Sequence, residues 1–157
     1  MQMKVISASE AHLLLRAAFA NGKHGGHCAR WVPPADNGRD WVLINLPLDW
    51  VAPNAAAERY DSTVDVHRAR TYAASVGQFA PIHLLYGARL QRRNVLTAAV
   101  MDGGHRVSAA RMRGDTRILA LLEQRHMEQL LEARAALLQD PMAVPRPTEP
   151  AIDSCTA

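Results

Sequence analysis

The chain has 157 residues, of which 48% are hydrophobic, 21% charged and only 5% aromatic, and its formal net charge is +3. This length suits one domain with its own core, the composition excludes a largely disordered chain, and the few aromatic residues disfavour an all-β sandwich. The two cysteines form no disulfide framework and no apolar run approaches the roughly 20 residues of a membrane span, so we expect a cytoplasmic protein without a membrane partner.

The first predicted elements are a strand and a helix. Met3–Ile6 suits a short strand, and Ser7 with Glu10 forms a capping box that opens a helix ending near Asn21. The residues that follow are rich in Gly, Pro, Asn and Asp, as in a long loop. We therefore expect residues 1–40 to form a helix-and-loop extension of the main domain.

The middle of the chain predicts two strands around a helix. Trp41–Leu46 suits a strand, and Val64–Val76 has a helical apolar pattern that Gly77 would close. Ile82–Tyr86 follows Pro81 as the next strand. The residues expected on the buried stripe of the helix are Val64, Ala69, Tyr72, Ala73 and Val76.

The last third predicts two more strands and two helices. A strand over Val95–Met101, buried from Thr97 onward, leads into a helix from His105 to Gly114, and Arg117–Leu122 is a further strand. An amphipathic helix then covers Glu123–Gln139, and the proline-rich residues 140–157 form a flexible tail. The expected core contacts are Val107, Ala110 and Met112 in the first helix and Met127, Leu130, Leu131, Ala135 and Leu138 in the second. The fold class is α/β, a mixed sheet with helices, and residues 41–139 form the main domain.

The most informative stretch runs from Ala99 to Gly114, where an apolar strand, a Gly103-Gly104 turn and a helix follow one another. A helix N-terminus offers unpaired N–H groups and a partial positive charge, and glycine lets the backbone approach an anion closely. His105 and Arg106 follow at once, where they can add donors or charge. The pattern predicts a phosphate site, and the alternative is an ordinary tight turn with two solvated basic residues.

Three side chains of this stretch each have two interpretations. Arg106 can bind phosphate oxygens in a bidentate fork, or it can pair with a carboxylate such as Asp102 or Asp115. Asp102 can hold Mg²⁺ together with substrate phosphates, or it can accept backbone N–H bonds in the turn or cap the helix. His105 can donate to a phosphate or can be a packed residue.

The chain resembles the ParB/sulfiredoxin superfamily over roughly residues 41–122. The motifs that carry the resemblance are Gln78–Tyr86 with its Pro-Ile-x-Leu strand, Val100–Ala110 with Asp-Gly-x-His-Arg and an Ala-Ala pair, and the strand that follows Gly114. The resemblance implies a compact α/β domain that binds a nucleoside triphosphate, ATP or CTP with Mg²⁺. It places the phosphates on Gly103, Gly104, His105 and Arg106.

Two departures from the superfamily narrow the expected function. Sulfiredoxins carry their catalytic cysteine directly before His-Arg, where this chain has Gly104, and the helix-turn-helix region of partition proteins has no counterpart here. We expect a nucleotide-binding protein, an NTPase or DNA nuclease, that serves plasmid or mobile-element DNA maintenance or transfer. The alternative is a non-enzymatic interaction protein of the same fold, such as a fertility-inhibition or regulatory factor.

Other groups carry weaker hypotheses. The resemblance implies that one carboxylate near the start of the helix at Val64 could act as a base, and the alternative is capping of that helix. A His/Cys cluster could bind Zn²⁺ but lacks a fourth ligand, and the alternative is a mobile loop. An arginine-rich set could contact DNA backbone, and the alternative is a solvated loop. The apolar stripe of the last helix suits packing on the sheet, a homodimer or a protein partner. The residues of the first three groups are Glu58, Asp61 and Asp65; His24, His27 and Cys28; and Arg89, Arg92, Arg93, Arg111, Arg113 and Arg117.

Overall fold

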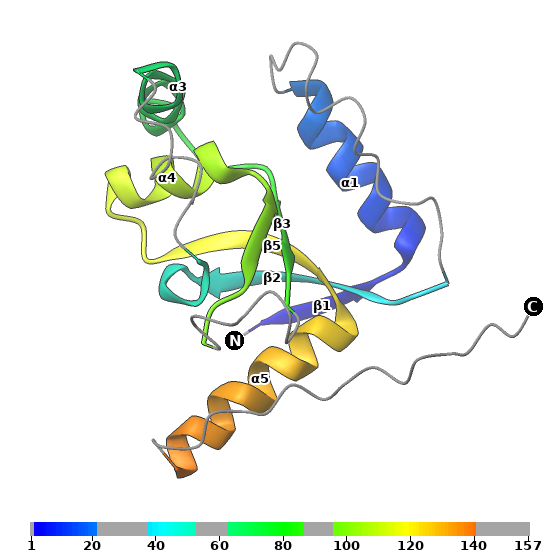
Figure 1. Cartoon of the computed structure of the whole chain (residues 1–157). Helices are drawn as coiled ribbons and strands as arrows, with labels where there is room; N and C mark the ends of the chain where they lie inside the picture. Colours follow the sequence, from blue (N-terminus) through cyan, green and yellow to red (C-terminus); the bar gives the residue numbers. More distant parts are fainter. Residues whose placement is uncertain (1, 22–37, 53–62, 87–95, 141–157) are drawn as a thin grey trace, which may run out of the picture.

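The computed structural model describes residues 2–21, 38–52, 63–86 and 96–140, and within them the chain is mixed α/β (Figure 1). The five strands are β1 (Met3–Ile6), β2 (Trp41–Pro47), β3 (Ile82–Leu85), β4 (Ala99–Asp102) and β5 (Arg117–Glu123). The four described α-helices are α1 (Ala8–Asn21), α3 (Thr63–Ala73), α4 (Gly104–Arg113) and α5 (Gln124–Gln139), and a short 3-10 helix covers Leu48–Trp50. These bounds match the predicted elements within a few residues.

All five strands belong to one sheet in the order β1-β2-β5-β3-β4. The β3–β5 pair is parallel and the other pairs are antiparallel, with Trp41 opposite Glu123 and Ile44 opposite Ala120 in the β2–β5 ladder. Since β1 pairs along the edge of β2, the N-terminal 40 residues contribute a strand to the sheet rather than a helix and loop alone.

Alternate residues of the strands feed two cores on opposite faces of the sheet. On one face Val42, Ile44 and Leu46 pack with residues of α4 and α5, and on the other Trp41 packs with α1. Figure 1 shows α1 and α5 on opposite sides of the sheet, and α3 lying beside α4. The second core is the smaller one and consists of Ile6, Ala8, Ala11, Leu15, Trp41 and Leu121.

Two of the predicted helix signals are visible as hydrogen bonds. The backbone N–H of Glu10 donates to Oγ of Ser7 at 3.2 Å, which confirms Ser7 as the cap of α1. At the end of α4, Gly114 adopts φ 76° and its N–H donates to the carbonyls of Ala110 and Arg111. The glycine therefore ends this helix by taking the left-handed conformation that other residues avoid.

Several residues predicted for the core are exposed instead. Val76 lies beyond the end of α3 and is fully exposed, Met112 is 50% exposed, and Leu138 is 87% exposed. In α5 the buried residues are Met127, Leu130 and Ala133, while the predicted Ala135 is exposed. The apolar stripe of α5 covers the sheet only along the first part of the helix, because the helix continues past the sheet (Figure 1).

The apolar run from Thr97 to Met101 was predicted to be a buried strand. The prediction is wrong for the second half of the run. Thr97 and Ala98 are buried, but β4 is an edge strand and Met101 is 43% exposed. An edge strand has a neighbour on one side only, so an apolar sequence does not by itself imply burial there. No helix of the described residues is both long and apolar enough to cross a membrane.

Candidate functional site

The turn between β4 and α4, residues 102–106, is called the β4–α4 corner below. β4 ends at Asp102, Gly103 adopts φ 98° and ψ 20°, and the N–H of Val107 donates to the carbonyl of Gly103 at 3.0 Å as α4 begins. A Cβ atom on residue 103 would lie 2.6 Å from Cγ2 of Ile82 in β3. Glycine is therefore required at this position both by the backbone conformation and by the close approach of β3.

The electrostatics at the start of α4 favour an anion. No side chain caps this helix, and its first turn contains no acidic residue. Helices that start without a side-chain cap direct backbone N–H groups and the positive end of the dipole outward. The corner therefore is an uncapped helix start, a local geometry that can accept an anion.

The Arg106 side chain is directed into the protein. Its Nη1 donates to the carbonyls of Ala80 at 2.9 Å and Pro81 at 2.6 Å, and its Nη2 lies 2.7 Å from Oδ2 of Asp102. The residue is only 8% exposed. Arg106 therefore pairs with a carboxylate, which was the second of its two interpretations, and it also binds two backbone carbonyls. These bonds connect the corner to the segment that leads into β3.

Asp102 is engaged by the same ion pair, in which both side chains are largely buried. Its charge is offset by Arg106, so it does not add a free negative charge beside the start of α4. No group of three or more His, Cys, Asp or Glu side chains in the described residues has a geometry that could hold a metal ion. His105, the second residue of α4, is partly buried.

His83 is a buried titratable residue that the sequence analysis did not single out. It pairs with Asp102 across β3 and β4, is 3% exposed, and its ring centroid lies 5.3 Å from that of Trp41. The pKa of His83 is lowered from 6.5 to about 4, chiefly by burial and also by nearby His126, while the charges of Asp102 and Glu123 act in the opposite direction. The sequence signal for this burial was the position of His83 inside the apolar strand Ile82–Leu85. Successive residues of a strand face opposite sides of the sheet, so His83 faces the side that carries Trp41 and α1.

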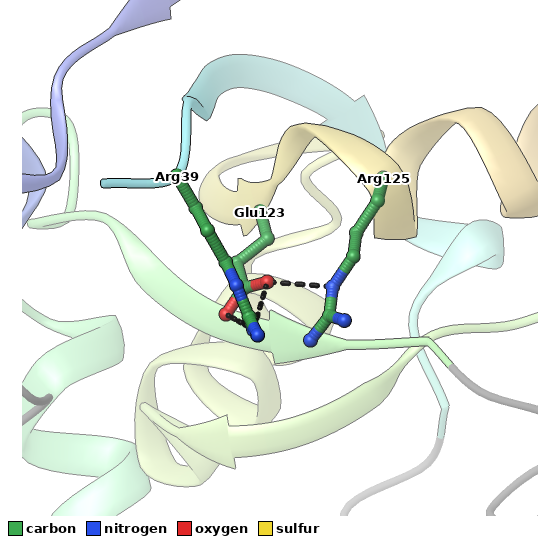
Figure 2. A network of polar contacts seen from close by, with 3 residues as sticks. All are labelled: Arg39, Glu123 and Arg125. Atoms are coloured by element: carbon green, nitrogen blue, oxygen red, sulfur yellow. Dashed lines mark hydrogen bonds and ion pairs between the residues drawn. The ribbon is translucent and has the colours of Figure 1, made fainter. Parts of the chain in front are cut away.

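A second polar cluster lies where β5 ends and α5 begins. Nη1 of Arg39 and Nε of Arg125 approach Oε2 of the buried Glu123 at 3.2 Å and 2.7 Å (Figure 2). Nearby His126 has its pKa lowered, chiefly by burial. The two guanidinium groups supply the charge that a buried carboxylate needs, so this cluster joins the entry of β2 to the start of α5.

Three arginines of the predicted basic surface donate to backbone carbonyls. Arg111 donates to Val51 at 2.9 Å, Arg113 to Gly77 at 3.0 Å, and Arg117 to Asn45 at 2.5 Å, and all three residues remain exposed. The other weaker candidates lie outside the described residues. They are Glu58, Asp61, His24, His27, Cys28, Arg89, Arg92 and Arg93, together with tail residues 141–157. Asp65 lies in α3, but its side chain is not among the described ones.

The chain was compared with family models, with curated proteins and with solved structures. None of them matches. The ParB/sulfiredoxin resemblance therefore stays a prediction from the sequence motifs.

Proposed function

We propose that the protein binds the phosphates of a nucleoside triphosphate, ATP or CTP, at the β4–α4 corner. The observation that carries this proposal is the conformation of Gly103, which opens an uncapped helix whose first turn holds no acidic side chain. Such a helix start is a general anion site in proteins. The order of motifs that resembles the ParB/sulfiredoxin superfamily supports the same ligand.

In this proposal the backbone supplies the phosphate contacts. The N–H group of Gly104, the first residue of α4, is directed at the ligand, and the helix dipole favours its negative charge. Arg106 acts as a positioning residue, because its bonds to Ala80 and Pro81 hold the corner against β3. This differs from the role as a phosphate ligand that the resemblance implies for Arg106.

The donor set does not suit a separate magnesium site at the corner. Mg²⁺ in nucleotide sites is held by one or two carboxylates plus substrate phosphates, and here Asp102 is paired with Arg106 at 2.7 Å. We therefore propose that Mg²⁺ enters bound to the triphosphate. In this proposal Asp102 has a structural role, as the partner of Arg106.

The biological role we propose is plasmid or mobile-element DNA maintenance or transfer, with the protein acting as an NTPase or nuclease. A second candidate is a non-enzymatic interaction protein of the same fold, such as a fertility-inhibition or regulatory factor. The pairing of Asp102 with Arg106 favours this second candidate, because a neutralised carboxylate is a poor base or metal ligand.

The proposal is tested by titrating ATP and CTP, each with Mg²⁺, into the protein in a calorimeter. His105→Asp adds a negative charge to the first turn of α4, where the dipole favours it, so the helix should stay folded while phosphate affinity falls at least about tenfold, or about 1.4 kcal/mol. His105→Asn, the neutral match, should weaken binding much less. Equal affinities for the two variants would exclude the helix start as the phosphate site, and no heat with any nucleotide would exclude the ligand.

Turnover separates the two candidate roles. Phosphate release is measured with and without plasmid DNA, and cleavage is measured on the plasmid DNA. Release or cleavage that His105→Asp abolishes supports an enzyme. Nucleotide binding without release or cleavage under any of these conditions supports the interaction protein.

A further inference from the structure

Two histidines and a buried carboxylate lie together where β3 comes close to the end of β5 and the start of α5. His83 of β3 is 3% exposed, and Glu123, the last residue of β5, is 8% exposed. His126 lies in the first turn of α5, and its Nδ1 atom is buried and makes no hydrogen bond with the described residues. Residues 123–126 are called the β5–α5 junction below.

Both histidines share one carboxylate. Glu123 attracts a proton to each of them, while the charge of His126 repels a proton on His83. Arg39 and Arg125 already pair with Oε2 of Glu123 at 3.2 Å and 2.7 Å, and both oppose a proton on His126 (Figure 2). A protonated His126 would therefore be the third cation around a single buried carboxylate.

The other elements packed here do not offset this excess of positive charge. Asp102 of β4 also attracts a proton to His83, but it is already paired with Arg106 at 2.7 Å. It therefore does not offer a free negative charge to a protonated histidine. Other charged or titratable residues on these elements are Glu10, His12 and Arg16 of α1, Asp40 before β2 and Glu128 of α5; Glu10 pairs with Lys4, and Asp40 and Glu128 are exposed.

The middle of α5 is anchored independently of the junction. Nη1 of Arg134 donates to the carbonyl of Leu96 at 2.5 Å, and the guanidinium lies 4.0 Å from the ring centroid of Trp50. At the junction itself, the N–H of Gln124 donates to the carbonyl of Asp40 at 2.9 Å. The junction can therefore open while the later turns of the helix stay in place, since local opening breaks only part of the contacts of a fold.

We propose that the β5–α5 junction is an acid-sensitive device, which opens as the pH falls from about 7 to about 5 while the sheet and the rest of α5 stay folded. Both nitrogens of a protonated imidazole are donors, so Nδ1 of His126 would become a buried donor without an acceptor among the described residues. Opening relieves this cost and the repulsion from the two guanidinium groups, because water then solvates the charge. The lowered pKa of both histidines agrees in direction, since the open form binds more protons as the pH falls. The inference does not depend on nucleotide binding at the corner.

The test is hydrogen exchange of the backbone amides of the full chain, measured by NMR at about pH 7 and about pH 5 and corrected for the intrinsic exchange rate. The junction amides, Gln124 among them, should lose at least about threefold in protection, with a limit of about tenfold per pH unit below 6.5 for one added proton. Low concentrations of urea should not speed their exchange, because local opening exposes little surface. The same urea should speed exchange in the centre of β2, which requires global unfolding.

Two variants assign the effect to His126. His126→Gln keeps a polar side chain that takes up no proton, so it should remove most of the pH dependence at the junction. His67→Gln is the matched control, because His67 is an exposed residue of α3, and its junction amides should behave as in the unaltered protein.

Three results would overturn the inference. They are junction protection that does not change between the two pH values, the same urea dependence for the amides of the junction and of β2, and a pH dependence that persists in His126→Gln. Circular dichroism checks the fold of each variant. If His126→Gln does not fold, the pH and urea dependence of the unaltered protein decides the matter.

Discussion

Replacing Gly103 with alanine tests whether the corner depends on close packing as well as on backbone conformation. At φ 98° an L-residue is disfavoured by about 1–2 kcal/mol. The new Cβ would also lie 2.6 Å from Cγ2 of Ile82, far inside the usual contact distance of about 3.5–4.0 Å. Overpacking of this kind costs about 1–3 kcal/mol, so the total expected loss of unfolding free energy is about 2–5 kcal/mol.

Gly114→Ala is the matched control, because it carries the conformational cost without the clash. Gly114 ends the same helix at φ 76°, and a Cβ there would meet no atom within 4 Å. We expect it to lose only about 1–2 kcal/mol. The difference between the two variants then measures the contact with Ile82.

The assay is urea unfolding followed by circular dichroism, with the midpoint and slope fitted for each variant. A third variant, Ile82→Leu, removes the branch at Cβ and should reduce the cost of Gly103→Ala in the double variant. Equal stabilities for Gly103→Ala and Gly114→Ala, or a cost that Ile82→Leu does not change, would refute the packing argument.

Two further predictions concern the two cores. The pKa of His83 is lowered from 6.5 in the unfolded chain to about 4 in the folded protein, so the unfolded chain binds more protons between these pH values. The contribution of His83 to the unfolding free energy is therefore fully present above pH 6.5, and up to about 3 kcal/mol of it is lost as the pH falls to 4. Denaturation at several pH values should show this slope, His83→Phe should flatten it, and an unchanged slope would contradict the assignment. Met127→Ala removes a buried side chain of α5 and should cost about 2–5 kcal/mol, whereas Leu138→Ala at the exposed end should stay within about 0.5 kcal/mol. Similar midpoints for these two variants would show that the end of α5 is packed in solution.

Local signals in the sequence were enough to place most elements. The Ser7 hydroxyl and the Gly114 backbone mark helix ends through bonds to residues a few positions away, so short windows of sequence contain the whole interaction. Apolar periodicity found the start of the α5 stripe at Met127 but extended it to Leu138. Periodicity gives the direction of a face but not where the partner surface ends.

The candidate site was predictable only in part, because its side chains are held by distant residues. The order of strand, glycines and helix in the sequence predicted the turn between β4 and α4 and the need for glycine at residue 103. It did not show that Arg106 would donate to Ala80 and Pro81, about 25 positions earlier in the chain. His83 was missed for the same reason, since its environment comes from β2, β4 and α5.

The position of β5 has a consequence for how the protein is made. This strand is translated after the other four, yet it lies between β2 and β3 and completes both. Until it leaves the ribosome, β2 keeps one open edge and β3 lacks its parallel neighbour, and such edges are prone to join other chains. The sheet must therefore assemble after most of the polypeptide has been synthesised, and folding depends on long-range pairing that slows it.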